Sequence, residues 1–256
     1  MAIPTKPPLI HFMRSEAPDE SLRGTHSGII ECVTAEEAGP TELAVFHKLC
    51  QSYWYPLFAF VRKSGFGTID AGNAVRGFFA KLLEPGFLSY SDHAEGLLRP
   101  FLMACFKRYL TDPSSHEHAR KSAVSPDRIP FDVDWAEARY GREPTHYEIP
   151  EALYERCWAL TILDFALKRL EKEWRDKVSI ENFKKLIPFL GYQGGDDDVQ
   201  ATVANRMGIS LESFKSKVHK LRTDHRNALL AQVAFTCDDQ ESDALKSELM
   251  ELVSSV

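Results

Sequence analysis

Residues 199–222 constrain the fold more than any other part of the chain, because their pattern predicts two short helices joined by a tight turn. Val199, Val203 and Met207 recur at helical spacing and predict one apolar face of a first helix. Gly208 lies where the chain must turn sharply, and Ser210 is a natural N-cap for the next helix. In that helix the apolar positions recur at i, i+4 and i+7: Phe214, Val218 and Leu221. The pattern predicts a helix-turn-helix.

The second predicted helix carries a cationic, hydrogen-bonding outer face. With its apolar positions turned inward, these side chains remain outside: Glu212, Ser213, Lys215, Lys217, His219, Lys220 and Arg222. A compact helix pair with such a face fits the major groove of DNA. The alternative is an ordinary helical hairpin whose lysines form a solvated surface. The aspartates at 196–198 precede the first helix, where carboxylates favour the positive end of the helix dipole.

Charge is unevenly distributed along the 256 residues. The net charge of −6 argues against a protein that simply coats nucleic acid. Residues 199–232 hold six basic and two acidic side chains (+4), and residues 41–121 hold ten and seven (+3). Residues 122–160 hold four and eight (−4), and residues 233–256 hold one and six (−5). Two mildly basic modules with acidic flanks suit a protein that grips DNA at two places while another partner supplies most of the affinity.

No run approaches the roughly 20 apolar residues that span a bilayer, so we expect no membrane insertion. The N-terminus has prolines where a signal peptide carries its apolar core, and we expect a cytoplasmic protein.

Cys50, Cys105 and Cys157 lie in apolar helical patterns and are expected to be buried free thiols. His116 and His118 have no further ligands nearby at a recognisable spacing, so we expect no metal site. Without a phosphate-binding glycine loop or a nucleophile–base pair, we expect no cofactor, no catalytic residue and no enzyme.

The N-terminal half predicts a disordered segment at residues 1–24 and then a helical domain at 25–112. A first helix from about Leu43 ends at residues 63–65, and Pro56 should kink or split it. A second helix from about Ala71 stops at Glu84, before Pro-Gly. A third, from Leu97, ends at residues 112–113.

The C-terminal half predicts a second helical domain after a linker. Residues 113–150 contain five prolines and are too long for a loop inside a compact domain, although residues 131–140 have the composition to fold locally. A helical block at 151–232 follows, with one apolar stripe made of Trp158, Ile162, Ala166, Leu170 and Trp174. Residues 233–256 predict an acidic C-terminal helix. The fold class is therefore all-α, with two helical domains.

Several segments, in order along the chain, resemble one bacterial protein family. Residues 207–222 (MGISLESFKSKVHKLR) are similar to the promoter-reading helix-turn-helix of extracytoplasmic-function sigma factors, specificity subunits of RNA polymerase in the sigma-70 family. Three segments look like the N-terminal domain of that family: 53–65 (YWYPLFAFVRKSG), 78–84 (FFAKLLE) and 101–112 (FLMACFKRYLTD). Two more are similar to a longer subgroup with a C-terminal extension: 131–140 (FDVDWAEARY) and 155–163 (ERCWALTIL). The resemblance covers roughly residues 25–253.

The resemblance implies a subunit that binds core RNA polymerase, at the β′ clamp helices and the β flap, and positions it on promoter DNA. An N-terminal region-2-like domain of three or four helices would face the −10 element with Lys107, Arg108, Arg120 and Lys121. A C-terminal region-4-like domain would read the −35 element with Ser213, Lys215, Lys217, His219, Lys220 and Arg222. Ser213 and Lys217, near the helix N-terminus, would touch base edges. The polymerase-docking face would comprise Asp70, Asn73, Arg76 and Gly77. An anti-sigma factor is a further partner that the resemblance allows.

The docking face departs from the family pattern. The family carries Asp-Leu-x-Gln-Glu on its second helix, and residues 73–77 here read Asn-Ala-Val-Arg-Gly. Asn73 and Gly77 remove charge, and Arg76 adds a cation. Gly72 and Gly77 would each cost about 1 kcal/mol of helix stability relative to alanine.

The segment that would approach the −10 element also departs from the family pattern. Pro113 interrupts a helix that runs on in the family, and only Arg120 and Lys121 remain of its basic segment. These departures support an alternative function: a sigma-like DNA-binding regulator or interaction protein that no longer docks on core polymerase.

Overall fold

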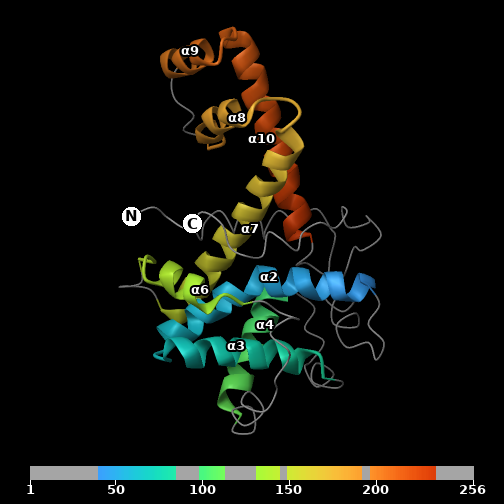
Figure 1. Ribbon diagram of the computed structural model, residues 1–256, viewed down its shortest axis with the longest axis vertical. Coiled ribbons are helices and arrows are strands. Elements are labelled where there is room, and N and C mark those ends of the chain that lie inside the picture. Colours follow the sequence, from blue (N-terminus) through green and yellow to red (C-terminus); the bar gives the residue numbers. More distant parts are fainter. Residues whose placement is uncertain (1–39, 85–97, 113–130, 145–148, 192–196, 235–256) are drawn as a thin grey trace. The chain divides into compact units, whose positions relative to one another are not determined.

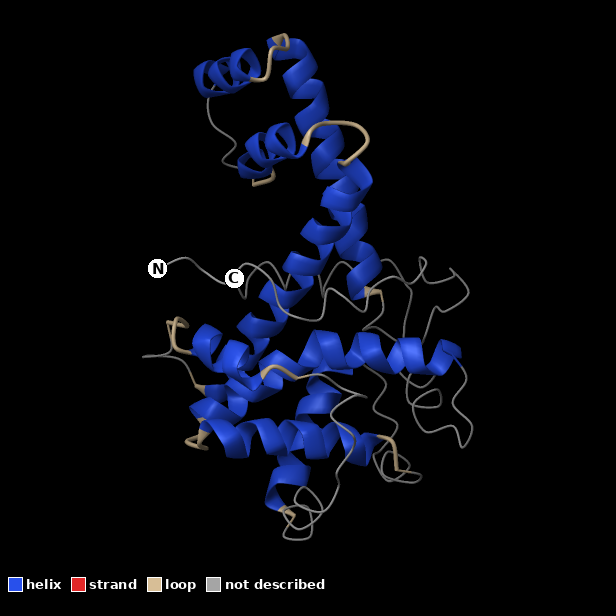
Figure 2. Ribbon diagram, in the orientation of Figure 1, coloured by secondary structure: helices blue, strands red, loops and turns tan. Residues whose placement is uncertain are grey.

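The computed structural model describes residues 40–84, 98–112, 131–144, 149–191 and 197–234. In these ranges the regular structure is helical and no strand occurs (Figure 2), which confirms the all-α prediction. The chain divides into two compact units, with the second at Thr161–Val233. Several expectations lie outside the described residues: the disordered segment 1–24, the His116–His118 pair, Arg120, Lys121, and the C-terminal helix beyond Ala234.

In its described residues the first unit contains the helices α2 (Pro40–Lys63), α3 (Thr68–Leu82), α4 (Leu98–Thr111) and α6 (Val133–Tyr140) (Figure 1). The start of α7 (Pro150–Trp174) also belongs to it. Helix α2 ends where the sequence predicts, with Gly65 in the left-handed region at φ 98°. Pro56 does not split α2, which continues through it as one helix with the proline buried.

Aromatic side chains fill the core of the first unit. Phe78 packs against Phe106 from α4, with ring centroids 4.9 Å apart, and Phe79 packs edge-on against Phe46 from α2. Four apolar side chains of α3 and α4 are buried in this domain: Phe78, Phe79, Leu82 and Phe101. Cys50, Cys105 and Cys157 are buried free thiols, as predicted.

Helix α6 packs on α2 and α3, although its sequence lies in the predicted linker. The Asp132 side chain caps the helix by accepting a hydrogen bond from the Trp135 backbone N–H at 2.8 Å. Phe131 stacks on Trp54 of α2, with ring centroids 5.0 Å apart and planes at 10°. Residues 131–144 therefore extend the first unit, and the boundary between the two units falls after Leu160, within the sequence of α7.

The second unit contains the rest of α7, α8 (Ile180–Leu186), the 3-10 turn η2 (Ile187–Phe189), α9 (Asp197–Arg206) and α10 (Leu211–Val233). Its core joins Leu170 and Trp174 of α7 to Phe183 of α8 and Ala204 of α9. Three side chains of α10 complete this core, as the sequence predicts: Phe214, Val218 and Leu221. The predicted α7 stripe, from Trp158 to Trp174, is also buried.

One prediction for α9 was wrong. Val199 is 48% exposed and does not line the apolar face, which is formed instead by the buried Ala204 with the half-buried Val203 and Met207. Val199 lies in the first turn of α9, whereas the residues that contact the core come from its second half and the turn that follows.

Candidate nucleic-acid interface

The turn between α9 and α10 has the local geometry of a helix-turn-helix. Gly208 takes a φ of 69°, a left-handed conformation that glycine adopts without steric cost. The Ile209 N–H donates to the Ala204 carbonyl at 3.1 Å, which closes the end of α9. The Ser210 hydroxyl then accepts from the Ser213 N–H at 3.2 Å and caps α10, as predicted.

Packing fixes which face of α10 is turned outward. Phe214 is fully buried and meets Phe189 edge-on, with ring centroids 5.0 Å apart. At about 100° per residue, the line opposite this buried face runs through exposed residues. These are Glu212, Ser216, His219 and Thr223.

The predicted −35 residues all lie on α10 but differ in exposure. Lys215, His219, Lys220 and Arg222 are exposed, whereas Ser213 and Lys217 are half-buried at the edge of the face. The two residues chosen for base contacts therefore do not occupy the centre of the outward surface. Ser216 does, and sequence reasoning missed it because position along the helix was given more weight than the angle from Phe214.

Arg222 is engaged within the unit itself. Its Nε donates to the Phe189 carbonyl at 2.8 Å, and its Nη2 donates to the Gly191 carbonyl at 2.9 Å. These carbonyls lie at the end of the α8–η2 segment, where backbone acceptors lack helical partners. Arg222 thus satisfies two of them and ties this segment to α10.

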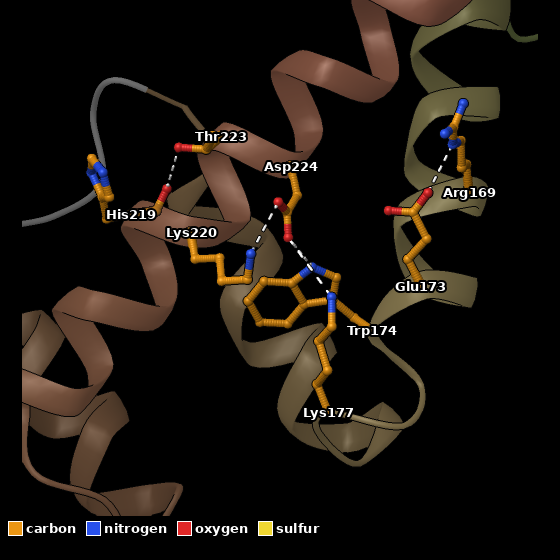
Figure 3. Close-up of polar contacts among 8 residues, drawn as sticks. All are labelled: Arg169, Glu173, Trp174, Lys177, His219, Lys220, Thr223 and Asp224. Carbon is orange, nitrogen blue, oxygen red and sulfur yellow. Dashed lines mark hydrogen bonds and ion pairs between the residues drawn. The ribbon is translucent and has the colours of Figure 1, made fainter.

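Lys220 is paired with Asp224 one turn later on α10. Figure 3 shows the Asp224 carboxylate between three donors: Trp174 Nε1 at 3.0 Å, Lys220 Nζ at 3.4 Å and Lys177 Nζ at 4.0 Å. Lys177 comes from the turn after α7, a position that sequence reasoning did not consider. No local pattern in the sequence indicates that this part of the chain meets Asp224, because Trp174 and Asp224 are 50 positions apart.

In the first unit, the two described residues of the predicted −10 set are exposed on α4. Lys107 forms an ion pair with Glu151 of α7 at 2.6 Å, which lowers the pKa of that carboxyl. Arg108 is the next residue on the helix. Tyr109, which follows Arg108 on α4, is 4% exposed and packs against Phe78. Burial raises the pKa of Tyr109 to about 12, so this phenol belongs to the core.

The face of α3 expected to dock on polymerase is partly covered by residues of the same unit. Asp70 and Asn73 are exposed, Gly77 is buried, and Arg76 is half-buried with its Nη2 donating to the Phe131 carbonyl at 3.0 Å. A Cβ at Gly72 would lie 2.8 Å from Cγ2 of Val133. The glycine that looked like a weakness of the helix leaves the space that Val133 of α6 fills. The outward side of α3 also presents Ile69, which is 75% exposed.

Polar contacts fasten the segment around α6 at two further points. Arg62 of α2 binds Glu137 in a two-pronged ion pair, with Nε–Oε2 at 2.8 Å and Nη2–Oε1 at 2.7 Å. This pairing lowers the pKa of Glu137 and raises that of Arg62. Tyr55 donates to the Glu143 carboxylate at 2.8 Å, and Arg156 of α7 donates to the same carboxylate at 2.8 Å. Residues 131–144, which cover part of α3, are therefore a packed part of the first unit.

Comparisons of the chain with protein-family models, with curated proteins and with solved structures found no match. In the described ranges, no helix has the length and apolar character needed to cross a membrane. The same residues contain no group of three or more His, Cys, Asp or Glu side chains able to hold a metal ion.

Proposed function

We propose that the chain is a sigma-type specificity subunit that binds promoter DNA through α9 and α10 and brings core RNA polymerase to it. The observation that carries this proposal is the α9–α10 pair, with its glycine turn, its serine cap and a buried Phe214 that turns a polar, cationic face of α10 outward. Such a helix fits the major groove, where its first turns meet base edges.

Position relative to the outward line of α10 separates the residues suited to base contacts from those suited to phosphate contacts. Ser216 and His219 stand at its centre and are the better candidates for base edges. Lys215 and Lys220 flank that line and suit phosphate contacts, with Lys217 at its half-buried edge. Arg222 is best assigned to holding the α8–η2 segment.

Docking on polymerase would use the open part of α3. Ile69, Asp70 and Asn73 offer one apolar side chain, one carboxylate and one amide on an exposed surface. An apolar anchor with polar neighbours is a common composition of binding surfaces.

A second candidate function rests on the covered part of α3. Because Arg76 donates to the Phe131 carbonyl and Val133 fills the space at Gly72, this part offers little to an outside partner. That arrangement favours a sigma-like regulator that binds DNA without docking on core polymerase.

Co-purification with core polymerase separates the two candidates. The sigma proposal expects the parent to bind core enzyme and Ile69→Ala with Asn73→Ala to weaken that binding. Asp164→Asn is a matched surface control, because Asp164 lies on an exposed part of α7 in the other unit. A parent that binds DNA but never core polymerase would leave the regulator as the function.

A further inference from the structure

We propose that Lys177 and Lys220 form a contact site for the DNA backbone and that Asp224 weakens this contact by holding both ammonium groups itself. The inference rests on the proposed DNA binding and adds two residues to it. Lys177 lies in the turn after α7, outside the helix-turn-helix, and Asp224 is an internal anion at the site (Figure 3).

The carboxylate of Asp224 is the fixed member of the group. Its Oδ2 accepts from Nε1 of Trp174 at 3.0 Å, and this tryptophan is buried in the core of the second unit. The Asp224 side chain is 17% exposed. An indole N–H this deep in the protein needs an acceptor, so Asp224 stays where it is.

The two ammonium groups are the exchangeable members. The side chains of Lys177 and Lys220 are 48% and 60% exposed, and each reaches Asp224 at a long ion-pair distance, 4.0 Å and 3.4 Å. Exposed pairs of this kind contribute little stability, because water and salt screen them. Lysine also has a long flexible stem, so both groups can turn toward another anion without disturbing the core.

A phosphodiester is the anion that this geometry suits. Two lysines from different elements converge on one point, one of them on the proposed DNA-binding helix. Neither presents the planar, two-pronged donor geometry that recognises a carboxylate or a base edge, so the contact is electrostatic and independent of sequence. With Asp224 present the group carries a net charge of +1 (two lysines, one aspartate), and the aspartate repels an approaching phosphate.

Asp224→Asn tests this directly, because the amide oxygen still accepts from Trp174 while the charge is removed. The readout is the affinity for a fluorescent DNA duplex of arbitrary sequence, measured over a range of salt concentrations. We expect roughly three- to tenfold tighter binding at low salt, and a log–log salt slope steeper by about 0.9 for each phosphate gained. Adding Lys177→Ala to this variant should cancel most of the gain.

The matched control is Glu173→Gln, which changes the net charge by the same amount in the same unit. Glu173 pairs with Arg169 along α7 at 2.8 Å, apart from the group around Asp224 (Figure 3). Equal gains from Glu173→Gln and Asp224→Asn would overturn the inference, because net charge alone would then explain both. An unchanged salt slope after Lys177→Ala in the parent would also overturn the inference. This variant leaves the Asp224–Trp174 hydrogen bond in place. A parent and Asp224→Asn variant that are both folded and both fail to bind any duplex would instead refute the proposed DNA binding.

Discussion

Replacing Gly72 by alanine should destabilise the first unit when position 133 is valine and stabilise it when position 133 is alanine. In a helix interior alanine is more favourable than glycine by about 1 kcal/mol. Here the added methyl group would lie 2.8 Å from Cγ2 of Val133, and the stiff valine side chain cannot turn away cheaply. Overpacking of this kind costs about 1–3 kcal/mol. Gly72→Ala should therefore lower the free energy of unfolding of the first unit by up to about 2 kcal/mol.

In a Val133→Ala background the obstacle is gone, and the same change should stabilise the unit by about 1 kcal/mol. The double-mutant cycle should thus give a coupling energy of about 1–3 kcal/mol between the two positions. Urea denaturation followed by tryptophan fluorescence measures it, since Trp54, Trp135 and Trp158 belong to the first unit. If Gly72→Ala stabilises both backgrounds equally, α6 does not pack on α3 as described.

Three further predictions concern the second unit. Phe214→Ala should lower its free energy of unfolding by about 3–5 kcal/mol, since this fully buried ring lies in the core, and an unchanged thermal melt would refute its burial. Arg222→Ala should lower this free energy by about 0.5–1.5 kcal/mol, because it removes two hydrogen bonds that tie the α8–η2 segment to α10. The salt slope of DNA binding should stay the same, and a flatter slope would assign Arg222 to a phosphate contact instead. Burial lowers the pKa of His225, so the folded unit binds a proton less readily than the unfolded chain and should lose stability as the pH falls below about 6.5. Between about pH 7.5 and 5.5 the free energy of unfolding of His225→Gln should fall less than that of the parent. An equal fall in both proteins would contradict this prediction.

Periodicity predicted the helices and much of the core, because a buried helix face repeats locally. Phe214, Val218 and Leu221 are buried as their spacing requires, and so is the stripe from Trp158 to Trp174. The serine cap of α10 was likewise visible from residues within one turn of each other.

Contacts between distant residues were not predictable in this way. Arg222 looked like an outward cation, and its partners lie 31 and 33 residues earlier in the sequence. Arg76 looked like an added charge on a docking face, and its partner is a backbone carbonyl 55 residues away. Gly72 illustrates the same limit, because the local cost of glycine was visible and the neighbour that requires it was not.

Transcription by purified core polymerase tests the central claim most directly. Core enzyme alone, core enzyme with the parent, and core enzyme with a Ser216→Ala, His219→Ala variant would be compared on DNA fragments from the source genome. The proposal predicts discrete transcripts that start only when the parent is present, and weaker or relocated starts with the variant, whose altered side chains lie on the outward line of α10. If no fragment yields a start with the folded parent, and the parent does not co-elute with core polymerase, the chain is not a sigma-type subunit.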